Sequence, residues 1–304
     1  MAISRAQLVK ELEPGLNALF GLEYKRYENQ HAEIYTTESS DRAFEEEVML
    51  SGFANAQVKA EGSGVSFDEA QETYTARYTH DTIALAFAIT EEAIEDNLYD
   101  RIASRYTKAL ARSMSNAKQV KAVTPLNNGL SSVATFNSGD GISLFSTNHT
   151  TVSGTAVKNT LTTQADLNET SLEQGLIDIA GMTDERGLRV AARGVKMIIP
   201  SANQFNAERL LKSPGRTGTA DNDINAVVSM GMVPQGYRVN NFLTDTDSWY
   251  IITDVPNGMK MFQRAALKTA MEGDFDTGNV RYKARERYSF GVSDYRGIFG
   301  VEGA

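Results

Sequence analysis

The residue best suited to proton-transfer chemistry in this chain is His149, which follows a loop rich in Ser, Thr and Asn. A histidine can act as a general base when a partner orients its ring. The chain has only three histidines, His31, His80 and His149, and sequence spacing identifies no partner for any of them. We therefore expect a structural or surface role for His149 and assign no catalytic residue.

Other patterns that could carry chemistry are incomplete. The chain has no cysteine, which excludes disulfides, thiolate metal sites and a cysteine nucleophile. No Gly-x-Ser-x-Gly elbow occurs with its strand and helix context, and residues 213–218 (SPGRTG) lack the lysine and spacing of a phosphate-binding loop. We expect no cofactor and no enzymatic activity.

Two acidic segments superficially suggest calcium loops. They are Asp221, Asp223 and Asn225 in the first, and Asp274, Asp276 and Asn279 in the second. Neither segment has a glutamate at the twelfth position, which a calcium loop of this kind uses as a bidentate ligand. We predict solvated turns or helix caps at both places and assign no metal site.

Composition narrows the function further. The 304 residues carry a formal net charge of -9, so we expect no basic field that would hold nucleic acid by its phosphates. No run of 18 apolar residues occurs, and residues 1–20 lack the apolar core of a signal peptide. The sequence favours a soluble protein that is not obviously secreted and does not associate with a membrane. From the chain length we expect two domains.

The strongest structural signal is a long amphipathic helix over residues 90–121. Thr90 is a candidate N-cap, acidic residues crowd the early turns and basic residues the late ones, as the helix dipole favours. Thr124-Pro125 is expected to stop the helix. The apolar stripe, which predicts a face packed on the core, consists of Ile94, Leu98, Ile102, Tyr106, Ala109, Leu110, Met114, Ala117 and Val120.

The segments before this helix have weaker patterns. Residues 4–22 predict a short helix broken at Pro14, and residues 23–40 an extended arm that needs a neighbour to order it. Residues 41–50 predict another short helix. Residues 53–61 and 65–88 flank Gly62-Ser63-Gly64 and predict a long hairpin, in which Tyr74, Ala76 and Tyr78 share one face. Two strands alone are marginally stable, so the hairpin should lie on its own domain or on another chain.

The second half of the chain alternates helix and strand patterns after a surface loop over residues 130–167. Residues 170–185 and 202–212 predict helices, the first with Leu172, Leu176, Ile177, Ile179 and Ala180 inward. Residues 195–199 and 249–253 predict buried strands, which together indicate an α/β unit. Residues 260–269, 279–290 and 293–301 predict strands that can pack on the long helix.

Five segments in order resemble the major capsid proteins of tailed bacteriophages, and the Mu-like major head subunits in particular. The resemblance covers nearly the whole chain and implies an α+β fold of the Hong Kong 97 type. It implies an N-terminal arm (1–50), an extended hairpin or E-loop (51–88), a peripheral domain with the spine helix (89–124 and 259–304) and an inserted axial domain (125–258). The segments are GDGISLFSTNHT (139–150), IIPSANQFNAERLLKS (198–213), DNDINAV (221–227), GYRVNNFLTDTDSWYIITD (236–254) and YSFGVSDYRGIFG (288–300).

The resemblance implies a subunit of an icosahedral shell that self-assembles into hexamers and pentamers around double-stranded DNA, without sequence-specific binding. Its expected place is the virion, after assembly in the bacterial host cytoplasm, and a portal and a decoration protein are further expected partners. Because the arm begins close to Met1, we expect a separate scaffolding protein and no removed N-terminal segment. An encapsulin-like nanocompartment is the alternative with the same fold, and an unrelated enzyme is the third reading.

Certain relatives join a hairpin lysine to an asparagine of the peripheral domain. Lys59, near the hairpin tip, and Asn279 occupy such places here, but no carboxylate in an apolar pocket can be identified from the sequence. We expect Lys59 to be solvated. We also predict that the hairpin over residues 53–78 contacts a neighbouring subunit, because its central part has too few apolar residues to cover a core.

Overall fold

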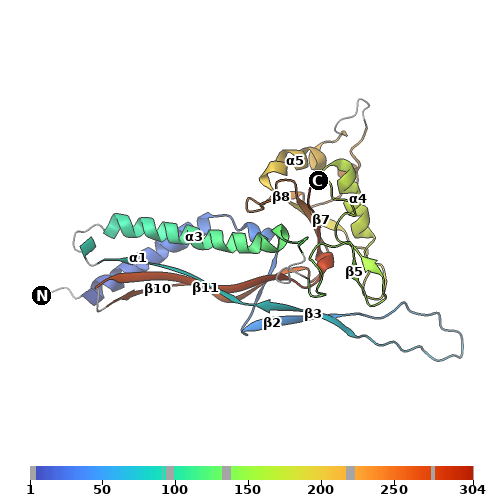
Figure 1. Ribbon diagram of the computed structural model, residues 1–304, viewed down its shortest axis with the longest axis horizontal. Helices are drawn as coiled ribbons and strands as arrows, with labels where there is room; N and C mark the ends of the chain where they lie inside the picture. Colours follow the sequence, from blue (N-terminus) through green and yellow to red (C-terminus); the bar gives the residue numbers. More distant parts are fainter. Residues whose placement is uncertain are drawn as a thin grey trace.

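The computed structural model describes residues 5–90, 92–93, 99–131, 138–216, 223–274 and 278–303. The molecule has three parts, which Figure 1 shows side by side: an elongated arm of helices and long strands, a compact α/β unit, and a hairpin that projects beneath that unit. Helices and strands are segregated in the arm, as in an α+β fold. The predicted fold class is confirmed.

The arm is built on a four-stranded sheet in the order β1-β10-β11-β4. The two long central strands are antiparallel, β1 runs parallel to β10, and β4 runs antiparallel to β11. Helices α1 and α3 pack on each other and on one face of this sheet, with Phe20, Leu110, Met114 and Tyr282 in their shared core (Figure 1). The strands are β1 (Thr36–Ser39), β4 (Asp81–Ile89), β10 (Met259–Gly273) and β11 (Val280–Val292), and the helices are α1 (Arg5–Arg26) and α3 (Tyr99–Asn127).

The long amphipathic helix is confirmed as α3 over the part of the chain that is described. Leu110 and Met114 are buried as the stripe predicts, whereas Tyr106 and Val120 are about half exposed. The expected stop at Thr124-Pro125 is wrong, because Pro125 lies inside the helix, which ends at Asn127. A proline this close to the end removes a single backbone hydrogen bond, and buried Leu126 holds the last turn on the core. Residues 94–98 lie outside the described part.

The N-terminal predictions need two corrections. Helix α1 continues through Pro14 without a break, so the expected interruption is wrong. The expected helix over residues 41–50 is instead a strand, β2 (Phe44–Leu50), which pairs with β3 (Glu72–Thr79). Its Glu-rich sequence fits either structure, and the partner strand decides between them.

The segment over residues 23–40 does not need another chain to become ordered. It contains the end of α1, the 3-10 helix η1 (Gln30–Glu33) and strand β1, whose Thr36 pairs with Lys260. Tyr35 lies buried beneath it and donates a hydrogen bond of 2.6 Å to the carbonyl of Ala122. A strand more than 200 residues away in the sequence therefore supplies the neighbour.

The α/β unit has a second four-stranded sheet, in the order β12-β9-β7-β8. Its core surrounds Trp249, which is fully buried and packs near Phe299. The predicted strands at 195–199 and 249–253 and the predicted helix at 202–212 are confirmed. The helix predicted over 170–185 is also present, but it ends at Ala180. The elements are α4 (Glu169–Ala180), β7 (Gly194–Ile199), η3 (Ser201–Asn203), α5 (Gln204–Lys212), α6 (Ala226–Ser229), β8 (Tyr237–Val239), β9 (Trp249–Thr253), η4 (Tyr295–Gly297) and β12 (Ile298–Val301), with a small hairpin of β5 (His149–Thr150) and β6 (Ala156–Val157).

Two details of this unit differ from expectation. Ile177 and Ala180 were expected to face inward, but both are exposed, Ile177 by 64%. The buried stripe of α4 is formed instead by Leu172, Leu176 and Ile179. The last predicted strand does not join the two long strands on α3. Instead, β12 pairs with β9, with Phe299 opposite Ile251, so this strand forms an edge of the α/β sheet.

The start of α4 shows how local chemistry fixes one of these elements. Asn168 precedes the helix, and its side chain accepts a hydrogen bond from the backbone N–H of Ser171. The Ser171 hydroxyl in turn accepts the backbone N–H of Asn168. This capping box satisfies two helix-terminal donors and starts α4 at Glu169.

Candidate assembly site: the projecting hairpin and its base

The hairpin has a paired base and an unpaired tip. Strands β2 and β3 pair from Phe44 opposite Thr79 to Leu50 opposite Glu72. The pairing differs from expectation, because the partner of β3 is residues 44–50 and not 53–61, and residues 81–89 leave the hairpin to join the long sheet as β4. Residues 51–71, called the tip below, contain no strand (Figure 1).

The tip exposes apolar side chains that nothing in the described chain covers. Val58 is fully exposed and Phe67 is 97% exposed, while Val65 and Phe53 are each more than half exposed. A cluster of exposed large apolar residues on a projecting segment is typical of a surface that binds another molecule. The tip is therefore the first candidate for a contact between subunits.

The base of the hairpin is anchored to the long sheet by apolar packing. Ala76 and Tyr78 are buried on the same face of β3, as predicted, and the ring of Tyr78 lies edge-on to Phe262 at 4.8 Å between centroids. Gly291 of β11 permits this approach, because a Cβ at that position would lie 2.6 Å from the Tyr78 ring. The alternation on β3 thus places one face of the hairpin on the body of the molecule.

A partly buried polar cluster next to Tyr78 holds the same junction together. The Lys260 ammonium group pairs with Glu38 at 3.1 Å and with Glu47, and Ser293 hydrogen-bonds both Glu47 and the Tyr78 hydroxyl. Burial alone lowers the pKa of Lys260, but the hydrogen bonds and charges of Glu47 and Glu38 outweigh it, so the pKa is raised and the side chain stays charged. We call these five residues the base clamp.

No sequence signal identified the base clamp. Lys260 and Glu47 are 213 positions apart, and each of the five residues taken alone is an ordinary strand or loop residue. Only the pairing of β1 with β10 and the packing of the β2-β3 hairpin against β10 bring them together. Such a cluster becomes visible only in the folded chain.

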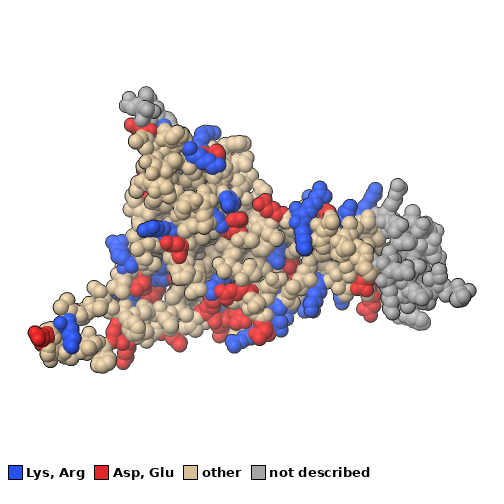
Figure 2. Space-filling view, turned by 180° about the vertical axis from the view of Figure 1, so that it is seen from behind, with Lys and Arg blue, Asp and Glu red and all other residues tan. Residues whose placement is uncertain are grey.

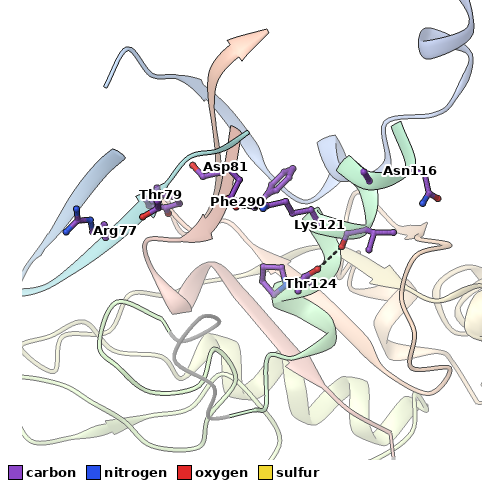
Figure 3. Close-up of a pocket in the computed structure, with 12 residues that line it drawn as sticks. Arg77, Thr79, Asp81, Asn116, Lys121, Thr124 and Phe290 are labelled. Atoms are coloured by element: carbon purple, nitrogen blue, oxygen red, sulfur yellow. Dashed lines mark hydrogen bonds and ion pairs between the residues drawn. The ribbon is translucent and has the colours of Figure 1, made fainter. Parts of the chain in front are cut away.

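Beside the base clamp is a groove of about 870 Å³ between the hairpin and the C-terminal half of α3. Arg77, Thr79 and Asp81 line one wall, as Figure 3 shows, and Asn116, Lys121 and Thr124 of α3 line the other. Lys121 pairs with Asp81 across the groove, and the Thr124 hydroxyl donates to the carbonyl of Val120 (Figure 3). Ser289 also belongs to the lining but is buried, and the half-exposed Val120 suits packing against a chain segment.

The candidate base His149 has a structural environment. Its ring is completely buried, stacks on Tyr295 at 3.9 Å between centroids, and uses both nitrogens, Nδ1 to Asp140 at 2.6 Å and Nε2 to Asn159 at 3.2 Å. Burial acts to raise the pKa of Asp140, but hydrogen bonds from His149 and Ser138 outweigh it and lower that pKa. The ring has no surface exposed to solvent, and its two hydrogen bonds join loop residues to each other. His149 therefore has a structural role.

The other two histidines are also buried. Burial and the nearby Lys118 charge lower the pKa of His31 to about 4. His80 lies between the hydroxyls of Ser40 and Ser289, at 2.9 and 3.0 Å, and burial lowers its pKa too. His80 therefore contacts two serine hydroxyls, of which that of Ser289 is buried in the body of the molecule.

The two acidic segments are only partly described, since Asp221 and Asp276 lie outside the described residues. Asn225 caps α6, accepting the backbone N–H of Val228, which agrees with the predicted helix cap. Asp274 pairs with Arg281. Within the described ranges no group of three or more His, Asp or Glu side chains could hold a metal ion.

Lys59 and Asn279 are not brought together within one chain. Lys59 is exposed in the tip, and Asn279 immediately precedes β11 at the far end of the long sheet. Figure 1 places these two parts at opposite ends of the molecule. Across the described part of the chain, no helix is both long and apolar enough to span a membrane.

Comparison with known proteins agrees with this architecture. The family model described as phage capsid protein matches residues 73–301. Among solved structures, the procapsid of bacteriophage JBD30 has a TM-score of 0.55 at 14% identity, covering 99% of this chain and 77% of that chain. No curated protein sequence matches.

Two further solved structures have similar scores. The virus-like particle from Pyrococcus furiosus has a TM-score of 0.54 at 11% identity, covering 94% of this chain and 98% of that chain. The capsid of the empty GTA particle has a TM-score of 0.53 at 13% identity and covers 91% of each chain. At such identities these likenesses show the fold.

Proposed function

The chain belongs to the phage capsid protein family and has the Hong Kong 97 type fold, and from that premise we propose that its copies assemble through the hairpin tip into the hexamers and pentamers of a closed icosahedral shell. It is a major capsid protein, a structural component of the virion. The observation that carries the proposal is the bare apolar tip on an anchored base. An apolar segment this exposed gains stability when another subunit covers it.

The finer parts of the proposal concern organisation and partners. We propose four parts whose bounds differ from those expected from the sequence: the N-terminal arm ends before β2, the hairpin runs from β2 to β3 (44–79), and the peripheral domain contains β4, α3, β10 and β11. The axial domain is residues 128–258 together with the last strand, β12. We further propose that a separate scaffolding protein shapes the shell, that a portal occupies one vertex, and that the shell encloses double-stranded DNA without reading its sequence. The net charge of -9 supports the last point, because like charge limits trapping of phosphates.

We also propose that the subunit has no enzymatic activity. The histidine best placed by sequence uses both ring nitrogens in structural hydrogen bonds. The groove beside the hairpin is lined by the ion pair of Lys121 and Asp81 and by apolar surface, and Ser289 in its lining is buried and hydrogen-bonded to His80. Both observations fit a subunit whose role is assembly.

The deciding experiment removes the tip and leaves the base. Residues 59–69 are deleted and the ends joined by a short glycine linker, which spares the base clamp and Tyr78. We expect the subunit to keep its helix content and cooperative thermal unfolding while electron microscopy shows no closed shells. Closed shells from the deleted chain, or an unfolded subunit, would refute the proposal.

The runner-up function is an encapsulin-like nanocompartment, which shares this fold. The likeness to the archaeal virus-like particle gives it some support, but the family match is to phage capsid proteins. The contents of shells purified from the natural source separate the two. Packaged DNA is expected, and a co-purified cargo enzyme without DNA would favour the nanocompartment.

A further inference from the structure

The chain contains two asparagine-glycine pairs, and the fold gives them opposite environments. They are Asn128-Gly129, which follows α3, and Asn257-Gly258, which lies between β9 and β10. In such a pair the backbone nitrogen of the glycine can attack the asparagine amide, because glycine has no side chain to obstruct the approach. Asparagine is among the residues least stable to heat in proteins. Each pair is therefore a candidate for covalent modification.

The second pair is accessible. Asn257 is exposed in a turn that it forms with Pro256, and its φ is 59°. Among the described residues, no hydrogen bond of normal geometry joins the Asn257 side chain or the Gly258 N–H to another group. The side-chain amide and the nitrogen that would attack it are therefore both available, and solvent reaches them.

The first pair is held in place. The Nδ2 of Asn128 donates to the carbonyl of Thr124 at 3.0 Å, and the Gly129 N–H donates to the carbonyl of Leu126 at 3.2 Å. Gly129 is also buried, and a Cβ at that position would lie 2.4 Å from the ring of Phe145. A reaction at this pair first requires the end of α3 to open.

The backbone itself requires the two residues of the accessible pair. A positive φ is uncommon for residues with a side chain, and asparagine is one of the few that adopt it readily. Gly258 packs against Gly297, and a Cβ on Gly258 would lie 2.7 Å from the Gly297 Cα. The position of Gly258 therefore excludes a larger residue, and the position of Asn257 favours asparagine or glycine. The reactive pair is a consequence of the local geometry.

We propose that Asn257 is a site of spontaneous deamidation. Solvent hydroxide removes the proton of the Gly258 N–H, the nitrogen forms a bond to the Cγ of Asn257, and ammonia leaves after taking a proton from water. The product is a succinimide ring. Water then adds to one of the two ring carbonyls and opens the ring, to aspartate or to isoaspartate according to the carbonyl attacked. The reaction consumes water and releases ammonia, and no group is oxidised or reduced.

Isoaspartate lengthens the backbone by one carbon atom at the crossover between the α/β unit and the arm. Residues 254–258 join β9 to β10, and the Gly258 carbonyl accepts the N–H of Ser293 at 2.9 Å. Because Ser293 belongs to the base clamp, the added atom displaces a contact that supports the hairpin base. The new carboxylate matters less, since charges of both signs are interspersed on the surface, as Figure 2 shows for one face. We expect subunits with isoaspartate to be less stable.

The test follows both pairs in the full-length subunit during incubation at neutral and at mildly alkaline pH. Digestion and mass spectrometry measure aspartate and isoaspartate at each position. In the folded subunit, product should form at Asn257 at least about tenfold faster than at Asn128, because the Asn128 pair must first lose two hydrogen bonds. The rate at Asn257 should rise with pH, since hydroxide removes the amide proton. In denaturant the two pairs should react at similar rates.

The matched variant for the effect on stability is Asn257→Gly. Glycine keeps the positive φ and has no side-chain amide. Incubation should lower the denaturation midpoint of the natural subunit and leave that of Asn257→Gly unchanged. The inference concerns the isolated subunit and does not depend on the proposed function.

Several results would overturn the inference. Absence of product at Asn257, or a rate that does not rise with pH, would exclude the succinimide route. Equal rates at the two pairs in the folded subunit, or unequal rates that persist in denaturant, would show that the fold does not select the site. An equal loss of stability in Asn257→Gly would mean that the change on incubation arises elsewhere.

Discussion

The base and the tip of the hairpin belong to one continuous segment, yet their environments are opposite. At the base, Tyr78 is 3% exposed and packs on Phe262, and Lys260 joins Glu38 and Glu47. In the tip, Val58 and Phe67 are almost fully exposed. The difference separates two roles along the segment, because buried contacts at the base stabilise the subunit and exposed ones at the tip remain available to a neighbour.

The largest expected effect comes from removing the ring that anchors the base. Tyr78→Ala should lower the free energy of unfolding by about 3–5 kcal/mol, because a buried aromatic ring leaves a cavity against Phe262. Chemical denaturation of the unassembled subunit measures this. Tyr106→Ala, on a ring that is 52% exposed on α3, is the control and should change stability by less than about 1 kcal/mol. Equal effects in the two variants would remove the contrast between anchored and exposed surface.

Low pH should destabilise the body of the subunit more than the tip, because all three histidines are buried in the body. Burial and Lys118 lower the pKa of His31 from 6.5 to about 4, so the unfolded chain binds a proton more readily than the folded one. Stability is therefore fully present above pH 6.5 and falls as pH drops toward 4, by about 2 kcal/mol after allowing for partial solvent screening. Unfolding measured across this range should show a shallower slope in His31→Gln. An unchanged slope would contradict the assignment.

The ion pairs of Lys260 in the base clamp should contribute less to the stability of the subunit than the Tyr78 ring. Lys260→Met removes the cation and leaves Glu38 and Glu47 without it, at a loss of about 1.5 kcal/mol in the free energy of unfolding, since both carboxylates are partly exposed. Lys212→Met, which removes a surface pair with Glu208, should have no measurable effect on denaturation. The comparison between base and tip would be sharpened if Lys260→Met also gave shells of irregular shape. A stable, normally assembling Lys260→Met subunit would show that apolar packing alone anchors the hairpin.

The smallest effect on stability is expected in the tip. Phe67→Ser should change the free energy of unfolding by no more than about 0.5 kcal/mol, because the ring is 97% exposed. Electron microscopy should nevertheless show fewer closed shells. Phe205→Ser, on a ring that is 67% exposed on α5, is the matched control and should assemble normally. A clear loss of subunit stability in Phe67→Ser would contradict the view of the tip as free surface.

Local patterns in the sequence determined the elements that bury one face. The alternation of Ala76 and Tyr78 with polar residues predicted β3, and the spacing of Leu172, Leu176 and Ile179 predicted α4. The same is true of the all-apolar strand β7 and of the long helix α3. In each case the side chains that meet the core are two to four residues apart, so a short window contains the whole signal.

Four basic residues at every second position of β11 were also visible in the sequence: Arg281, Lys283, Arg285 and Arg287. The strand itself was predicted, but a net charge of -9 does not show where charges lie along it, and Glu272 and Asp274 lie beside Arg281. A net charge contains no information about where the charged residues lie on the structure. Reading the alternation together with the charge would have found these four residues.

Tertiary structure alone decided which segments of the chain pair and pack with one another. Residues 41–50 form a strand because β3 lies beside them, and Pro14 and Pro125 stay within helices because packing on the sheet outweighs one lost backbone hydrogen bond. The base clamp joins residues more than 200 positions apart, and β12 leaves its sequence neighbours to pair with β9. Pairings at such separation depend on which surfaces meet in the folded chain, and local propensity, which acts over a few residues, carries no information about them.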